Sequence, residues 1–451
     1  MFKHIRQLTP FSAVLLAIAF IMSISQSTMT TTYPILMASF HVDASTVQWL
    51  TTGFMVAMTL VMPLSPWLLD NILLKPLLNG IVTVFVIGTA IAMLTPSFAG
   101  IIVGRLLEGI AVGALFPTFQ SVIIENTAKS DRGITMGVVG LVMGSALAVG
   151  PIISGIVLQY VSWRALFGLF LVTLIVLIVS LQPLIENTHT IHHSKFDWVS
   201  AITLIGFGGL LYSLSTISNT KLTITWWLIV IISVALLVVF VIRQISHQQP
   251  FLNLSVFKYR GFAPAMILTG LSYSGLITAT VLMPLFYQRV FHITPLWSGL
   301  LMVPAAVVLS QLNPRAGYLL TRIGLKNLVY IGMVMMIIGY LLLNQLGTQS
   351  WFIGLVAAIL LEGGNAFIMM PAVTAANNVL PKELVSHGTA VITTMRQVIG
   401  AGSVVIVGIL VTHFSQIEAI GVALTRTSGW FIFVPVIGIL LAMRLPHTKT
   451  K

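Results

Sequence analysis

Long apolar runs recur from one end of this chain to the other, and only short polar breaks separate them. A helix of about 20 apolar residues spans the hydrocarbon core of a bilayer. Only 7% of the 451 residues are charged and the mean hydropathy is +1.03, whereas roughly a quarter of the residues in soluble domains are charged. The pattern excludes a water-soluble globule and predicts an all-α, polytopic membrane protein embedded in a lipid bilayer.

Dividing the runs at their polar breaks predicts fourteen spans. Their approximate ranges are 10–38, 46–69, 77–95, 98–125, 133–158, 163–184, 198–218, 223–243, 261–288, 295–319, 327–346, 351–379, 387–412 and 428–445. Sixteen of the 22 Lys and Arg residues then fall in segments on the side of the N-terminus, and four fall on the other side. Because positive charge marks cytoplasmic segments, both termini are expected in the cytoplasm.

Two short basic turns indicate an internal repeat. Residues 66–75 read PWLLDNILLK and residues 317–326 read GYLLTRIGLK, and each would join two helices tightly. If these turns are equivalent, residues 1–184 form an N-terminal six-helix half and residues 260–451 a C-terminal one. Residues 185–259 would then hold a linker and an inserted pair of helices. Related halves facing a midplane site are a recurring plan of secondary transporters.

Composition and motifs exclude several classes of protein. The net charge of +12 is scattered singly between apolar blocks, so no nucleic-acid surface is expected. The absence of cysteine removes disulfides, thiolate catalysis and Cys-ligated metals. The histidines at positions 189, 192 and 193 are too few for a metal site. HExxH, GxSxG and P-loop motifs do not occur, so neither an enzyme nor a cofactor or metal is expected.

The first span is unusually polar, because Ser, Thr and Gln fill eight of the ten positions from 23 to 32, Ser25 and Gln26 among them, and Tyr33 follows. Polar groups at membrane depth must face protein or a water-filled cavity. We expect this span to line a substrate cavity. The alternative is that the hydroxyls bond to carbonyls of their own helix and to neighbouring helices.

The fourth span carries a buried charge pair. Arg105, Gly109, Gly113 and Pro117 recur every four residues, and Glu108 lies one turn from Arg105. One interpretation is an ion pair that only holds helices together. The other is a pair whose partner exchange, or whose carboxyl protonation, is coupled to substrate movement.

Glu362 lies near mid-bilayer on the twelfth span, with no basic residue in helical reach. Desolvation favours the neutral form of such an acid, so Glu362 is expected to bind a proton or a substrate cation. Arg396 on the thirteenth span is the expected charge partner across helices, and that contact would instead favour the anion. On the neighbouring spans Tyr273, Phe286, Asn365 and Met369 are expected to line an adaptable, largely apolar pocket.

The fifth span is rich in glycine, with Gly144, Gly150, Pro151 and Gly155 among its small and bending residues. Small residues at four-residue spacing let a second helix approach closely, and Gly-Pro provides a site of bending. A packed, pliable helix is expected.

At these residues the chain resembles the major facilitator superfamily and, within it, the fourteen-helix drug:proton antiporters of bacteria. Residues 104–117, GRLLEGIAVGALFP, look like the arginine motif of span four, and the resemblance implies that Arg105 lies beside the proton path. Residues 144–155 are similar to the antiporter motif of span five. The fold implied is that of two six-helix halves plus an inserted central pair.

The resemblance extends to the inner-loop gating motif. Asp70 and Lys75 match its acid and one of its bases, and Arg322 belongs to a second copy in which Thr321 replaces the acid. Relatives often carry an aspartate where this chain has Ser25, which shifts the expected coupling role to Glu108 and Glu362.

The expected function is therefore multidrug efflux across the bacterial cell membrane. Hydrophobic, often cationic drugs would be exported by alternating access in exchange for protons, with sodium as the alternative coupling ion. A second hypothesis keeps the fold and makes the cargo an endogenous metabolite, lipid or amino acid. An intramembrane enzyme or receptor would need a reactive group of side chains within the membrane, such as paired His with an acid or a Ser/His dyad, and the spans have none. A channel would not need the internal repeat that this chain shows.

Overall fold

The computed structural model describes residues 10–42, 44–47, 49–185, 191, 195–216, 223–247 and 250–445. All elements in these ranges are helical. Eleven of the helices found there are long and apolar enough to cross a membrane, and 132–146 and 198–213 are shorter apolar helices. The all-α membrane protein predicted from the apolar runs is confirmed, whereas the count of fourteen spans stays a prediction. The histidines at 189, 192 and 193 lie outside the described residues.

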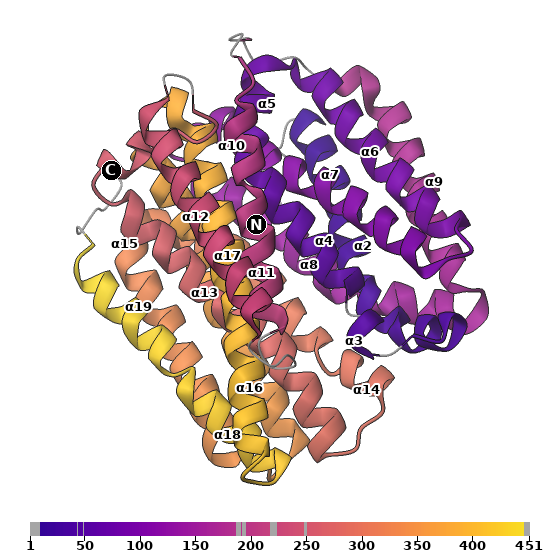
Figure 1. Cartoon of the computed structure of the whole chain (residues 1–451). Coiled ribbons are helices and arrows are strands. Elements are labelled where there is room, and N and C mark those ends of the chain that lie inside the picture. Colours follow the sequence, from indigo (N-terminus) through magenta and orange to yellow (C-terminus); the bar gives the residue numbers. More distant parts are fainter. Residues whose placement is uncertain are drawn as a thin grey trace.

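The helices form an N-terminal group, a central segment and a C-terminal group (Figure 1). The N-terminal group comprises α2 (Pro10–Phe40), α3 (Ala44–Val47), α4 (Trp49–Val61), η1 (Met62–Leu64), α5 (Ser65–Asn71), α6 (Leu74–Leu94), α7 (Phe98–Glu125), α8 (Arg132–Tyr160), α9 (Trp163–Leu181) and η2 (Gln182–Leu184). The central segment comprises α10 (Trp198–Thr203), α11 (Ile205–Thr216), α12 (Ile224–Ser246) and η3 (Leu254–Lys258). The C-terminal group comprises α13 (Phe262–Leu285), η4 (Phe286–Val290), α14 (Pro295–Leu300), α15 (Val303–Leu346), α16 (Trp351–Asn378), η5 (Lys382–Leu384), α17 (Val385–Ser415), α18 (Ile420–Trp430) and α19 (Phe433–Met443).

Helix α15 is two helical arms joined at Gly324, whose φ of 76° is accessible to glycine at little cost. The arms run side by side along α16, because Gly363 lies against Val308 and Gly364 lies against Gly332. Gly324 occupies the place in the second basic turn that Leu73, between α5 and α6, occupies in the first. The two turns thus break their helices at equivalent positions of the two sequence segments.

The two groups touch along α8 and α15. A Cβ added at Gly133 would lie 2.5 Å from the Gly317 carbonyl oxygen, and one at Gly137 would lie 2.7 Å from Asn313 O. Only residues without side chains allow backbones to approach this closely. We call the end of the bundle at which α5 lies (top of Figure 1) the α5 end, and the groups are in backbone contact there.

The last predicted span begins too late. It was expected over 428–445, but the helical region starts at Ile420, and a bend at Phe431 and Ile432 divides it into α18 and α19. The polar residues from Thr425 to Ser428 resemble a loop in sequence. In the structure Thr427 and Ser428 are buried and donate hydrogen bonds to backbone carbonyls of their own helix.

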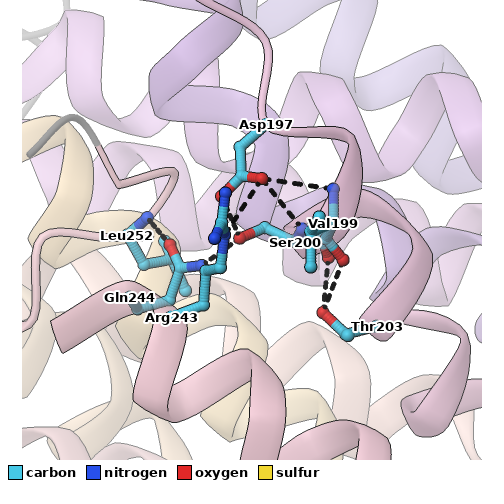
Figure 2. Close-up of polar contacts among 7 residues, drawn as sticks. All are labelled: Asp197, Val199, Ser200, Thr203, Arg243, Gln244 and Leu252. Atoms are coloured by element: carbon cyan, nitrogen blue, oxygen red, sulfur yellow. Dashed lines mark hydrogen bonds and ion pairs between the residues drawn. The ribbon is translucent and has the colours of Figure 1, made fainter. Parts of the chain in front are cut away.

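A polar network connects α10 and α12 of the central segment at its α5 end (Figure 2). Asp197 caps α10, accepting hydrogen bonds from the Val199 and Ser200 amides. Arg243 of α12 forms an ion pair with the same carboxylate at 2.9 Å. Gln244 donates to Ser200 Oγ. The carboxylate thus joins α10 to α12 in the part of the chain that separates the two groups.

Replacing Asp197 with asparagine should lower the free energy of unfolding. Burial opposes ionisation of Asp197, yet the hydrogen bonds from Arg243 and Ser200 outweigh it and lower the pKa to about 2. A depressed acid pKa stabilises the fold fully above the unfolded value of about 3.9, and this contribution, about 2 kcal/mol, is lost as the pH falls towards 2. Thermal unfolding in detergent at pH 7 should therefore give a lower Tm for Asp197→Asn.

The matched control is Glu418→Gln, which breaks an ion pair with Arg426 at 2.8 Å. The Arg426 side chain is 56% exposed, and Glu418 caps none of the described helices. Glu418→Gln should therefore lower Tm much less than Asp197→Asn does. Equal shifts in the two variants would contradict the role given to Asp197.

Candidate transport site

A buried ion pair in α7 joins four helices of the N-terminal group. Arg105 and Glu108 are 1% and 0% exposed, and Arg105 Nη1 donates to Glu108 Oε2. Thr89 of α6 donates to the other carboxylate oxygen at 2.7 Å. Arg105 also lies over the Phe54 ring of α4, 4.4 Å from its centroid, and within 3.5 Å of Ser25 Oγ on α2. The pair expected from the sequence forms, and Glu108 is fully engaged in it.

The four-residue spacing of α7 is a packing stripe against α4. Arg105 Nε donates to Leu50 O at 3.4 Å. A Cβ at Gly109 would overlap the Phe54 carbonyl oxygen, and a Cβ at Gly113 would overlap that of Met58. The contacts advance by four residues on both helices, so the two glycines serve close helix approach as expected.

Glu362 has a different environment from Glu108. It lies in α16, is 2% exposed, and its Oε2 atom has no hydrogen-bond partner among the described residues. No ion pair involves it there. The Tyr287 hydroxyl lies within its electrostatic reach and likewise lacks a partner in the described part of the chain. A buried carboxylate left this way is strongly destabilised as an anion and accepts a proton or a cation readily.

The structure does not bring Arg396 to Glu362 as the expected charge pair. Measured along α16 and α17 from their α5 ends at 1.5 Å per residue, Glu362 lies about 24 Å deep and Arg396 about 16 Å. Arg396 instead lies over the Tyr273 ring, 5.4 Å from its centroid. The expectation rested on neighbouring spans, which do not fix depth along the helices.

Most hydroxyls of the first span are satisfied by backbone. Ser23, Thr28 and Thr32 donate to carbonyls within α2. Ser27 donates to Ala146 O and Thr31 to Ser154 Oγ, both on α8. These contacts match the alternative given above, hydroxyls bonded within and between helices. Ser25 and Gln26 contribute differently, since Ser25 faces Arg105 and Gln26 is half-buried, and the Tyr33 hydroxyl bonds to Thr51.

The residues expected to form one pocket on the C-terminal group lie at different depths. Tyr273 and Phe286 are thirteen residues apart along one helical stretch, about 20 Å by the helical rise. Phe286 and Met369 are 1% and 6% exposed within the main apolar core. Asn365 Nδ2 donates to Ser272 Oγ at 3.3 Å, next to Tyr273, while its Oδ1 has no partner among the described residues.

The glycine-rich helix α8 makes the close contacts that its sequence predicts. A Cβ at Gly144 would lie 3.2 Å from Ser310 Cα of α15, and one at Gly150 would overlap the Ser27 hydroxyl of α2. Gly155 lies against Leu296 of α14. The side chain of Pro151 lies outside the described residues.

Contacts between the groups at the α5 end involve Asp70, which the gating motif singles out, together with residues that the sequence did not single out. His387 Nε2 at the start of α17 lies 4.0 Å from Asp70 Oδ2 of α5. Arg132 Nη1 donates to Asn378 Oδ1 at 3.1 Å. No local pattern could have revealed pairs more than 200 residues apart. Of the other turn residues, Lys75 lies in the first turn of α6, and the exposed Arg322 stacks on Tyr318 of its own helix.

Comparisons with known proteins agree with this architecture. The family model described as Major Facilitator Superfamily matches residues 15–404. The uncharacterized MFS-type transporter YcnB of Bacillus subtilis is 32% identical over 444 residues, covering 96% of this chain and 94% of the relative. The lincomycin resistance protein LmrB of Listeria innocua is 31% identical over 396 residues, covering 87% and 84%.

Among solved structures, an auto-inhibited peptide transporter of the POT family superposes with a TM-score of 0.67 at 12% identity, covering 97% of each chain, which supports the fold alone. The matched family model and the transporter relatives make this chain a multi-pass membrane transporter rather than an enzyme. The chain belongs to the Major Facilitator Superfamily.

Proposed function

We propose that this protein exports hydrophobic, often cationic drug molecules across the bacterial cell membrane in exchange for protons, by alternating access between its two groups of helices. Drug resistance in the name of a relative 31% identical supports the cargo class. The observation that carries the coupling is Glu362, a buried acid with one carboxylate oxygen unsatisfied among the described residues.

The membrane arrangement is part of the proposal. We propose fourteen spans, with α10 and α11 forming one span and α15 forming two, and units at 1–184, 185–259 and 260–451. The distribution of Lys and Arg supports a cytoplasmic α5 end and cytoplasmic termini. With this orientation the structure represents the state in which the cytoplasmic ends of the two groups are in contact.

Glu362 would couple the cycle by holding either a proton or a cationic cargo. An unpaired carboxylate at mid-membrane is stable only when neutralised, so binding of one ligand weakens binding of the other. Glu108 is a weaker candidate, because Arg105 and Thr89 already satisfy both of its oxygens. In this scheme the Arg105 pair holds α2, α4, α6 and α7 as a rigid unit beside the moving interface.

The proton gradient supplies enough energy for this exchange. A proton moving inward releases about 2.3 kcal/mol per 100 mV of membrane potential and about 1.4 kcal/mol per pH unit. One-for-one exchange with a monovalent cation cancels the voltage contribution and leaves the pH gradient as the driving force. A neutral cargo would make the same cycle sensitive to voltage.

Reconstituted vesicles test the proposal directly. We expect the protein to concentrate a cationic dye inside vesicles under an imposed pH gradient, and not under a sodium gradient of equal size. Uptake driven only by sodium would contradict proton coupling. Strong competition by lipids, amino acids or other endogenous metabolites, with no dye uptake, would instead identify an exporter of an endogenous compound.

A further inference from the structure

Arg396 is a buried cation that has no anionic partner among the described residues. It lies in α17, is 2% exposed, and its Nε and Nη1 atoms have no hydrogen-bond partner among the described residues. No described acid forms an ion pair with it. It faces the ring of Tyr273, 5.4 Å away. Its neighbour Gln397 reaches Met58 of α4 at 3.5 Å, so this turn of α17 lies where the two groups of helices meet.

A buried guanidinium with unsatisfied N–H groups is unfavourable unless a ligand supplies the missing acceptors. Arginine keeps its proton at any physiological pH, so it cannot escape burial by becoming neutral. Each buried donor left without a partner destabilises the fold, and more strongly when the donor is charged. The Tyr273 ring offsets part of this cost through its electron-rich face. The two unsatisfied N–H groups still need an acceptor, and a negatively charged one fits best.

The described part of the chain does not supply that anion. Of the ten Asp and Glu residues, Glu108 and Glu362 are the two that lie deep in the described spans. Glu108 is bound by Arg105, and Glu362 lies about 8 Å deeper in the bundle than Arg396, by the helical rise. The other carboxylate groups among the described residues are farther still, at the ends of the helices.

Unsatisfied acceptors accompany the guanidinium. Gln397 Oε1 and Asn365 Oδ1 are buried without hydrogen-bond partners in the part of the chain that the structure describes. Asn365 is tied to Ser272, the residue before Tyr273, through its other amide atom. The C-terminal group therefore presents two N–H donors of a cation, two amide oxygens and an aromatic ring at similar depth. A ligand that satisfies them carries an oxyanion, hydrogen-bond donors and an apolar body.

We propose that Arg396 binds the carboxylate of the exported molecule, so that the cargo includes zwitterionic and anionic amphiphiles and not only cations. This inference rests on the transport function proposed above and names the substrate class of the same site. The planar guanidinium matches a carboxylate in a bidentate geometry. Phosphate of a lipid headgroup has related chemistry, but Arg396 lies about 16 Å from the α5 end of its helix, below the depth of headgroups.

Equilibrium binding to purified protein in nanodiscs of zwitterionic lipid tests this without any gradient. The probes are an aromatic fluorescent dye that bears a free carboxylate and its methyl ester. We expect Arg396→Gln to weaken binding of the carboxylate dye about tenfold to a hundredfold, because a charge-assisted hydrogen-bonded pair is lost. The affinity for the ester should stay within about twofold of the wild-type value. Retained ester binding also demonstrates that the variant is folded.

Two further variants sharpen the test. Arg396→Lys keeps the charge but loses the planar fork, so it should bind the carboxylate dye several-fold more weakly than wild type and more tightly than Arg396→Gln. If Arg396→Gln does not fold, a Lys variant with unchanged preference for carboxylate over ester overturns the proposal. Arg164→Gln removes an exposed arginine that also stacks on an aromatic ring, Trp163, and should change neither affinity.

The other outcomes are equally informative. Equal weakening of both dyes by Arg396→Gln, or no weakening, overturns the proposal. Displacement of the carboxylate dye by added phosphatidylglycerol would assign Arg396 to a lipid phosphate and overturn it as well. Failure of pH-driven transport with this binding preference intact would refute proton coupling while leaving the carboxylate site in place.

Discussion

Vesicles containing the Glu362→Gln variant should lose dye uptake driven by a pH gradient, at least tenfold, while still exchanging dye for dye when no gradient is imposed. Glutamine has the size of glutamate but cannot take up and release a proton, so the exchange step that couples the two ligands disappears. Movement of the two helix groups does not require that proton, so exchange of bound dye should continue. Both activities are measured on the same vesicles by fluorescence quenching.

Glu108→Gln is the matched comparison, because it makes the same chemical change at the other deep acid. It leaves the buried Arg105 guanidinium without its anion, and loss of one partner of a buried pair destabilises a fold by about 3–5 kcal/mol. We expect a lower Tm and reduced dye exchange as well as reduced uptake. If Glu108→Gln abolishes only the pH-driven uptake and Glu362→Gln behaves as wild type, then Glu108 is the coupling acid.

Much of the helical framework could be predicted from the sequence, because apolar run length is a local property. Residues 98–125 were expected as one span, and α7 has the same bounds. The tight turn near Gly324 was also visible, since a basic break in an apolar run must lie outside the membrane. The last span was misplaced because buried Thr427 and Ser428 satisfy their hydroxyls within the helix, which sequence does not reveal.

Less of the site could be predicted from the sequence, because most of its contacts join different helices. Arg105 and Glu108 are one turn apart on one helix, so their pairing follows from helical geometry. Thr89 and Phe54, which complete that pair, come from other helices, and packing brings them in. The same holds for Arg396, whose depth relative to Glu362 depends on how α16 and α17 are offset.

The substitution Gly317→Ala should also reduce transport strongly, because its added methyl group would clash with the backbone contact between the two groups of helices. A Cβ on Gly317 would overlap the Gly133 carbonyl and lie 3.3 Å from Gly137 Cα, and backbone atoms cannot rotate away. Overpacking of this kind costs about 1–3 kcal/mol, which shifts a two-state equilibrium about fivefold to 150-fold. Gly317→Ala should therefore lower the population of the state that is closed at the α5 end. The transport rate should fall by a similar factor.

The chain contains no cysteine, so a labelled pair can report the shift without background. Spin labels at Lys129→Cys and Glu383→Cys, which are exposed near the Arg132 and Asn378 contact, should show longer distances in Gly317→Ala. Gly402→Ala adds the same methyl group where nothing lies within 4 Å, and it should leave the distances and transport unchanged. Unchanged distances in Gly317→Ala would mean that the two groups do not separate at this contact. The close approach of α8 and α15 would then be a fixed hinge, and alternating access would have to open elsewhere along the interface.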